Sequence, residues 1–158
     1  MSSDATEVGR KRLELARVQL VLCRAFDAAI IMRLKTVEDP SMPFVMGTDG
    51  LRLLVNPAML AELSVSEIVG VLVHESRHVA GLHPLRMEWR KDVVVSPDGV
   101  PVTLWNIACD ATINWPISKL EGLKLPEGCV PGIENTTPEA EYVKLQQMAS
   151  KLPKLALG

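Results

Sequence analysis

Apolar residues recur at helical spacing through the first part of the chain. They stand at Leu13, Ala16, Leu20, Phe26, Ile30 and Leu34. Between Asp4 and Thr36 the sequence has no proline and, after Gly9, no glycine. Because one helical face is apolar and the residues that break helices are absent, this pattern predicts one long N-terminal helix over residues 1–37.

Two later stretches carry the pattern of β-hairpins. Residues 44–55 are largely apolar and are interrupted by the sequence GTDG at 47–50. Residues 93–102 are rich in valine and are interrupted by SPDG at 96–99. Glycine and aspartate between two apolar runs favour a tight reversal, so we expect a short hairpin in each stretch, the second of which could form a flap.

Signals for helix N-termini predict three more helices. These are residues 65–82 after the capping box of Ser64 and Glu67, residues 104–114 after Thr103 and before Pro116, and residues 139–148 after Pro138. Residues 122–135 read as a loop. Together these elements predict an α+β fold that is mainly helical.

The length of the chain is that of one domain. A chain of 158 residues can bury a core without disulfides or a structural metal. We therefore expect residues 1–158 to form a single domain, with its core in residues 44–145 and a frayed tail at 150–158.

Composition and charge exclude some classes of partner. Apolar residues make up 47% of the chain and charged residues 23%, which is typical of globular proteins. The net charge of -2 gives no reason to expect binding to nucleic acid. The apolar stretch at residues 18–34 contains Arg24, Asp27 and Arg33, so no uninterrupted run approaches the ~20 residues that a bilayer requires. We expect no membrane partner.

The cysteines and the N-terminus indicate a compartment. The three cysteines, Cys23, Cys109 and Cys129, are odd in number and form no CxxC pair, which favours a reducing environment. The first seven residues are polar and lack the apolar region of a signal peptide. We therefore expect a cytoplasmic protein.

The strongest chemical signal is an HExxH sequence. Residues 74–78 read HESRH, and an apolar run over residues 68–73 leads directly into them. Two imidazoles four residues apart share one face of a helix and can bind a single metal ion. The motif predicts a zinc (Zn2+) site with His74 and His78 as ligands and Glu75 as the general base that activates water. The alternative is a chance match in an amphipathic helix.

A third protein ligand is needed, and two residues compete for this role. His83 follows His78 by five residues, so in a continuous helix it would be rotated about 140° away from it; a break at Gly81 could bring it back. Asp110 lies in an otherwise apolar stretch and offers a carboxylate that zinc accepts. We favour Asp110 and keep His83 as an alternative third ligand or as a donor to the oxyanion.

Other polar residues could support the site. Asn106 and Asn114 lie four residues before and after Asp110 and form one polar stripe with it. They could orient Asp110 or a histidine, although capping and packing are equally good explanations. Arg86 and Tyr142 are further candidates for stabilising an oxyanion.

Several separated motifs of the chain resemble one known family. The motifs are HESRH at 74–78 with HPLR at 83–86, WNIACD at 105–110 with IN at 113–114, LPEG at 125–128, and PEAEY at 138–142. They are similar to the metallopeptidase domain that often precedes a von Willebrand factor A-like domain in bacterial and phage proteins. The sequence contains no DxSxS motif of such an A-like domain, so we expect a standalone member or the catalytic fragment of a longer protein.

The resemblance implies a fold and a set of roles. It implies a zincin-like fold, His74 and His78 as ligands, Glu75 as base, and Asp110 as third ligand on a second helix of the active site. The leading hypothesis is therefore a zinc-dependent metallopeptidase or amide hydrolase that acts on a protein or peptide substrate. The alternative is a metal-stabilised binding or regulatory module without catalysis, in which Asp110 and His83 both bind the metal.

Overall fold

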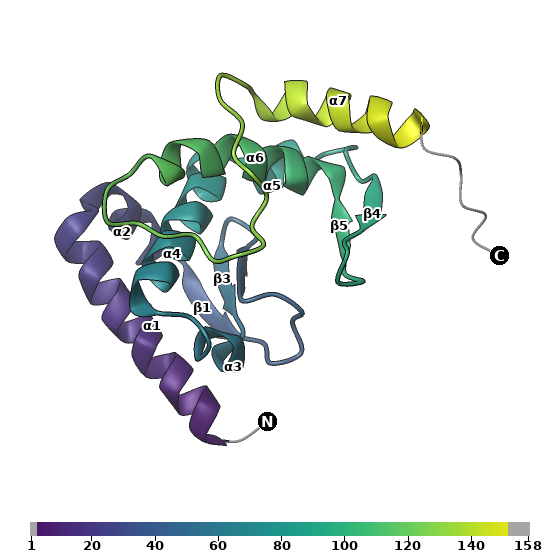
Figure 1. Ribbon diagram of the computed structural model, residues 1–158. Helices are drawn as coiled ribbons and strands as arrows, with labels where there is room; N and C mark the ends of the chain where they lie inside the picture. The colour runs from purple at the N-terminus through teal and green to yellow at the C-terminus, as the bar shows by residue number, and fades with distance from the viewer. Residues whose placement is uncertain (1–2, 152–158) are drawn as a thin grey trace.

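A computed structural model describes residues 3–151 and shows an α+β fold that is mainly helical (Figure 1). The helices are α1 (Ser3–Cys23), α2 (Ala25–Ile31), α3 (Pro57–Leu60), α4 (Val65–Ala80), α5 (His83–Arg86), α6 (Leu104–Ser118) and α7 (Pro138–Lys151). The strands are β1 (Lys35–Glu38), β2 (Met46–Thr48), β3 (Arg52–Val55), β4 (Val93–Val95) and β5 (Pro101–Thr103). The tail predicted to fray lies, from residue 152 on, outside the described residues.

The N-terminal helix is interrupted, and the prediction of one helix over residues 1–37 is wrong. Arg24 leaves helical geometry, with φ −142° and ψ 66°, and separates α1 from α2. The turn at Arg24 buries Asp27 against α4, where the hydroxyl of Ser76 donates a hydrogen bond to it over 2.6 Å. Residues 35–38 then form β1, because they find a partner strand in β3. The helix break and the strand therefore depend on tertiary contacts. No proline or glycine in the sequence marks either of them.

Both predicted hairpins are confirmed. Strands β2 and β3 are antiparallel, and Gly50 in their connection has a φ of +92°, a conformation that glycine adopts easily. Strand β1 adds to the other side of β3 in parallel, which gives the order β1-β3-β2. Strands β4 and β5 form a separate antiparallel pair that extends away from the helices (Figure 1).

Helix α4 is the central element of the fold. Its N-terminus carries the predicted capping box, in which Ser64 and Glu67 satisfy each other's backbone N–H groups. Helices α1, α2 and α6 and strand β2 all contact α4, and its residues 68–73 are mostly buried in the main core. A Cβ atom at Gly70 would lie 2.1 Å from the carbonyl oxygen of Lys124, so the loop after α6 lies directly on α4.

Helix α6 connects two apolar clusters. At its C-terminal end Ile113 and Ile117 join the main core with α1, α2 and α4. At its N-terminal end Leu104 and Trp105 pack with Tyr142 of α7 in a second cluster. Helix α6 crosses α4, and α7 lies over α6 on the outside of the molecule (Figure 1).

Helix α6 also extends one turn further than the sequence predicted. It continues through Pro116 to Ser118, whereas we expected Pro116 to end it. Proline removes one hydrogen bond from a helix interior, but Ile117, which is 1% exposed, gains burial from this extra turn. Within residues 3–151 no helix has the length and apolar character needed to cross a membrane.

Candidate metal centre

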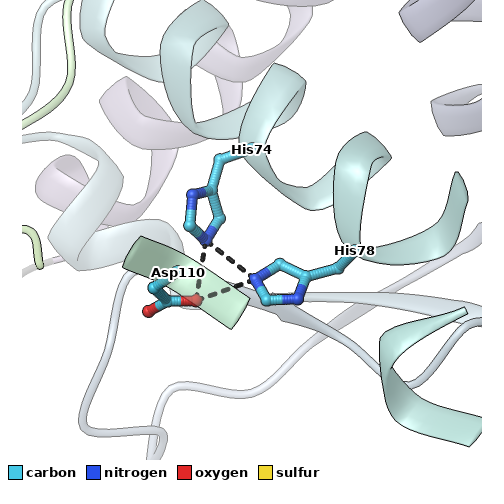
Figure 2. A group of neighbouring side chains, drawn as sticks. All are labelled: His74, His78 and Asp110. Atoms are coloured by element: carbon cyan, nitrogen blue, oxygen red, sulfur yellow. Dashed lines mark hydrogen bonds and ion pairs between the residues drawn. The ribbon is translucent and has the colours of Figure 1, made fainter. Parts of the chain in front are cut away.

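Helices α4 and α6 bring two imidazoles and one carboxylate together. His74 and His78 lie one turn apart on α4, and Asp110 faces them from α6 (Figure 2). The Nε2 atoms of the two histidines are 2.9 Å apart. Oδ1 of Asp110 is 2.9 Å from Nε2 of His78 and 3.4 Å from Nε2 of His74. Three atoms that are good metal ligands therefore meet at one point.

The other ring nitrogen of each histidine is held by a neighbouring side chain. Nδ1 of His74 is 2.7 Å from Oδ1 of Asn114, whose amide group donates to the carbonyl of Val130 over 2.8 Å. That second bond orients the amide, so its oxygen faces His74 and the imidazole must carry its proton on Nδ1. Nδ1 of His78 is 3.2 Å from Nδ1 of His83. Both histidines therefore have an Nδ1 partner and turn Nε2 toward Asp110.

Asp110 completes this arrangement. Its Oδ2 accepts a hydrogen bond from the amide of Asn106 over 3.3 Å. Its Oδ1 is buried and faces the Nε2 atoms of the two histidines, which carry lone pairs when each ring is neutral and holds its proton on Nδ1. A buried carboxylate oxygen and two imidazole lone pairs directed at one another require a positive charge between them.

These distances fit a zinc ion. Tetrahedral ligands that each lie about 2.0–2.1 Å from zinc are about 3.3 Å from one another. The separations of 2.9, 2.9 and 3.4 Å are close to this value, so small side-chain rotations would admit the ion. Two nitrogens and one carboxylate oxygen are also a donor set that zinc prefers in catalytic sites, where a fourth position remains open.

When no metal is bound, a proton has to take the place of the ion. Burial disfavours a charge on His74, but its hydrogen bond and its attraction to Asp110 and Glu75 outweigh burial and raise the pKa of His74 to about 9. Burial likewise disfavours the charge on Asp110, but the two histidines outweigh it and lower the pKa of Asp110 to about 2. The carboxylate is therefore ready to bind a cation at every physiological pH.

Glu75 is the remaining acidic group near the three candidate ligands. Its side chain is buried, with 6% of the residue exposed. Burial raises the pKa of Glu75, against the opposing influence of His74 and His78, and no hydrogen bond contributes to the shift. A carboxylate that accepts no hydrogen bond from the described residues, 3–151, and is more basic than usual is suited to accept a proton.

The other residues considered from the sequence are engaged elsewhere. His83 meets the far nitrogen of His78 and does not join the three candidate ligands. Arg86 donates to Glu139 and, over 2.9 Å, to the carbonyl of Gly81. Tyr142 is 1% exposed and donates its hydroxyl proton to Asp92.

The sequence analysis missed two contributions to the site. The carbonyl of Val130 orients Asn114, and no sequence signal marks a backbone carbonyl. Asp27 holds the reverse side of α4 through Ser76 and through an ion pair with Arg77 at 3.2 Å. An acidic residue inside an otherwise apolar helical stretch was the available signal for Asp27.

One comparison with known proteins gives a match. A family model described as "Putative metallopeptidase domain" matches residues 9–154, which is nearly the whole chain. No curated protein and no solved structure is significantly similar to the chain. The matched residues include the three candidate ligands His74, His78 and Asp110. The chain belongs to the family described as "Putative metallopeptidase domain".

Proposed function

We propose that this protein is a zinc-dependent, HExxH-type peptidase or amide hydrolase. In this proposal His74, His78 and Asp110 bind the metal and Glu75 is the general base. The observation that carries the proposal is the meeting of two Nε2 atoms and one buried carboxylate oxygen within 3.4 Å, where a single cation can bind all three. Membership of the family supports a metal-dependent hydrolase at the coarser level.

The arrangement of the helices supports a zincin-like architecture. The two histidines come from one buried helix, and the third ligand comes from the next long helix that crosses it. His83 is paired with His78 at 3.2 Å and is not among the three candidate ligands, so a fourth position remains for water or substrate. An open position is the feature that separates a catalytic zinc site from a structural one.

The proposed reaction is the addition of water to the carbonyl of a peptide or amide bond. Zinc, when bound in such a site, lowers the pKa of water toward ~7 and polarises a carbonyl group. Glu75 accepts the proton that water loses as its oxygen bonds to the carbonyl carbon, and returns this proton to the amine that leaves when the C–N bond breaks. Asn114 keeps the ring of His74 in place during both steps.

The three candidate ligands are mostly covered. The side chains of His74, His78 and Asp110 are 14%, 9% and 17% exposed, and Oδ1 of Asp110 is buried. Partial burial strengthens the electrostatic interactions of the site. We propose a protein or peptide segment as the substrate.

The test is the variant Glu75→Gln. It should bind one zinc ion per chain like the wild type, measured by elemental analysis, and cleave a library of quenched fluorescent peptides at least about 100-fold more slowly. Glu62→Gln, which changes an exposed glutamate before α4, is the matched control and should cleave normally.

Three results would contradict the proposal. Undiminished turnover by Glu75→Gln would show that Glu75 is not the general base. A wild-type protein that binds no zinc after supplementation would show that the three candidate ligands do not form a zinc site. A zinc ion held by four protein ligands, with no cleavage of any peptide, would favour the non-catalytic binding module instead.

A further inference from the structure

His83 is the third histidine of the chain, and it lies next to the candidate ligands without joining them. Its Nδ1 is 3.2 Å from Nδ1 of His78, and the two rings meet edge to face with an interplanar angle of 85°. Only 6% of His83 is exposed. A polar contact of this kind between two buried rings needs one proton shared between two nitrogens.

The direction of that hydrogen bond follows from the position of Asp110. Nε2 of His78 is the atom that faces Oδ1 of Asp110 and Nε2 of His74. If this Nε2 is to bind a metal it must carry no proton, so the proton of a neutral His78 ring is on Nδ1. Nδ1 of His78 is then the donor and Nδ1 of His83 the acceptor.

We propose that His83 is a positioning residue, which fixes the tautomer and the ring orientation of His78 for metal binding. The inference rests on the proposed function, because it assumes that His78 is a ligand. It assigns His83 a role that differs from that of a third ligand or an oxyanion donor. The contact corresponds to that between His74 and Asn114, so each metal-binding imidazole has its own acceptor at Nδ1.

The backbone around His83 is shaped to hold this ring against His78. Helix α4 ends at Ala80, and Leu82 adopts a left-handed conformation with φ 53° and ψ 31° that turns the chain back. Such a conformation is unfavourable for leucine and persists only where surrounding contacts enforce it. One of these contacts is the indole of Trp105, which donates to the carbonyl of His83 over 2.9 Å.

Gly81 leaves the room that the ring of His83 occupies. A Cβ atom at this position would lie 2.4 Å from Nε2 of His83, and the three nearest atoms all belong to that ring. The backbone of Gly81 is right-handed, with φ −79° and ψ −3°, so alanine is allowed by conformation. A side chain at position 81 would therefore displace the ring of His83 before it met any other group.

The first test compares two substitutions of His83 in the full chain. His83→Leu fills similar space but accepts no hydrogen bond, and it should weaken zinc binding by about 10–100-fold. His83→Asn has less volume but places an amide oxygen near the position of Nδ1, and it should recover most of this affinity. Affinity is measured by competition with a chromophoric zinc chelator, and circular dichroism checks that each variant folds.

The second test uses Gly81→Ala. Alone, it should weaken zinc binding by pushing the ring of His83 away from His78. In the His83→Asn background, where no ring occupies the space, it should have no further effect. Such non-additivity would show that Gly81→Ala weakens zinc binding through the ring of His83. A general loss of stability would instead weaken zinc binding equally with and without His83→Asn.

Cobalt(II) spectra distinguish positioning from direct ligation. The visible spectrum of the Co²⁺-loaded His83→Leu variant should keep the shape of the wild-type spectrum, since the ligand set is unchanged, while more Co²⁺ is needed to reach it. A spectrum that indicates the loss of one imidazole would make His83 a ligand and overturn the inference.

The remaining outcomes also decide the question. Wild-type affinity in His83→Leu would overturn the inference and leave the proposed function intact. The inference would also be overturned if His83→Leu kept more of the zinc affinity than His83→Asn, because the role of His83 would then be packing. If the wild type binds neither Zn²⁺ nor Co²⁺, the inference and the proposed function fail together.

Discussion

The affinity of this protein for zinc should rise with pH up to about pH 9. In the proposed site zinc binds the neutral imidazole of His74, so it competes with the proton that this ring holds when no metal is bound. Burial opposes that proton, but Asp110 and Glu75 outweigh burial and raise the pKa of His74 to about 9. An ordinary histidine, with a pKa near ~6.5, would release its proton well below neutral pH.

The size of the effect follows from this one proton. Below the pKa of about 9 of His74, each decrease of one pH unit should weaken the apparent affinity for zinc by about tenfold. The Kd at pH 7 should therefore be about 100-fold higher than the Kd at pH 9. Asp110 adds no slope in this window, because the histidines lower its pKa to about 2 and it stays ionised throughout. Above about pH 9 the affinity should level off.

The assay is a competition titration with a chelator of known pH dependence, at constant ionic strength, from pH 6 to the limit set by zinc hydroxide formation. Asp110→Asn is the informative comparison. This change removes the hydrogen bond and the charge of Asp110, which together raise the pKa of His74, so the slope above pH 7 should largely vanish although binding is weaker overall.

Two results would refute this reasoning. An affinity of the wild type that is constant between pH 7 and pH 9 would mean that His74 holds no proton in the metal-free protein. If zinc affinity depended on pH as steeply in Asp110→Asn as in the wild type, the competing proton would be held by a group other than His74 and Asp110.

Two further predictions concern the contacts that support the site. Asn114→Leu removes the acceptor 2.7 Å from Nδ1 of His74 and should weaken zinc binding by about 10–100-fold in the chelator assay; unchanged affinity would show that Asn114 does not orient the ligand. Ser76→Ala removes the hydroxyl that bonds to the buried Asp27 over 2.6 Å and should lower the free energy of unfolding by about 1–3 kcal/mol in urea. Undiminished stability would mean that Arg77 alone satisfies this carboxylate.

Local sequence signals predicted most of the secondary structure. The capping box of Ser64 and Glu67 marked the start of α4, and the two turn sequences marked both hairpins. These features involve residues close in the chain, whose conformation depends mainly on backbone sterics and short-range hydrogen bonds. The spacing of His74 and His78 likewise determined that the two imidazoles share one face, because any helix places residues four apart on the same side.

Long-range packing decided the remaining features. The break at Arg24 and the pairing of β1 with β3 depend on partners that come later in the chain. The contact of His74 with Asn114 joins residues 40 positions apart, and the ring nitrogen that each histidine turns toward Asp110 follows from such contacts. The sequence alone determined which residues share a helix face; the tertiary structure decided which faces meet and which atoms they present, because these depend on how α4 and α6 bury their apolar sides against each other.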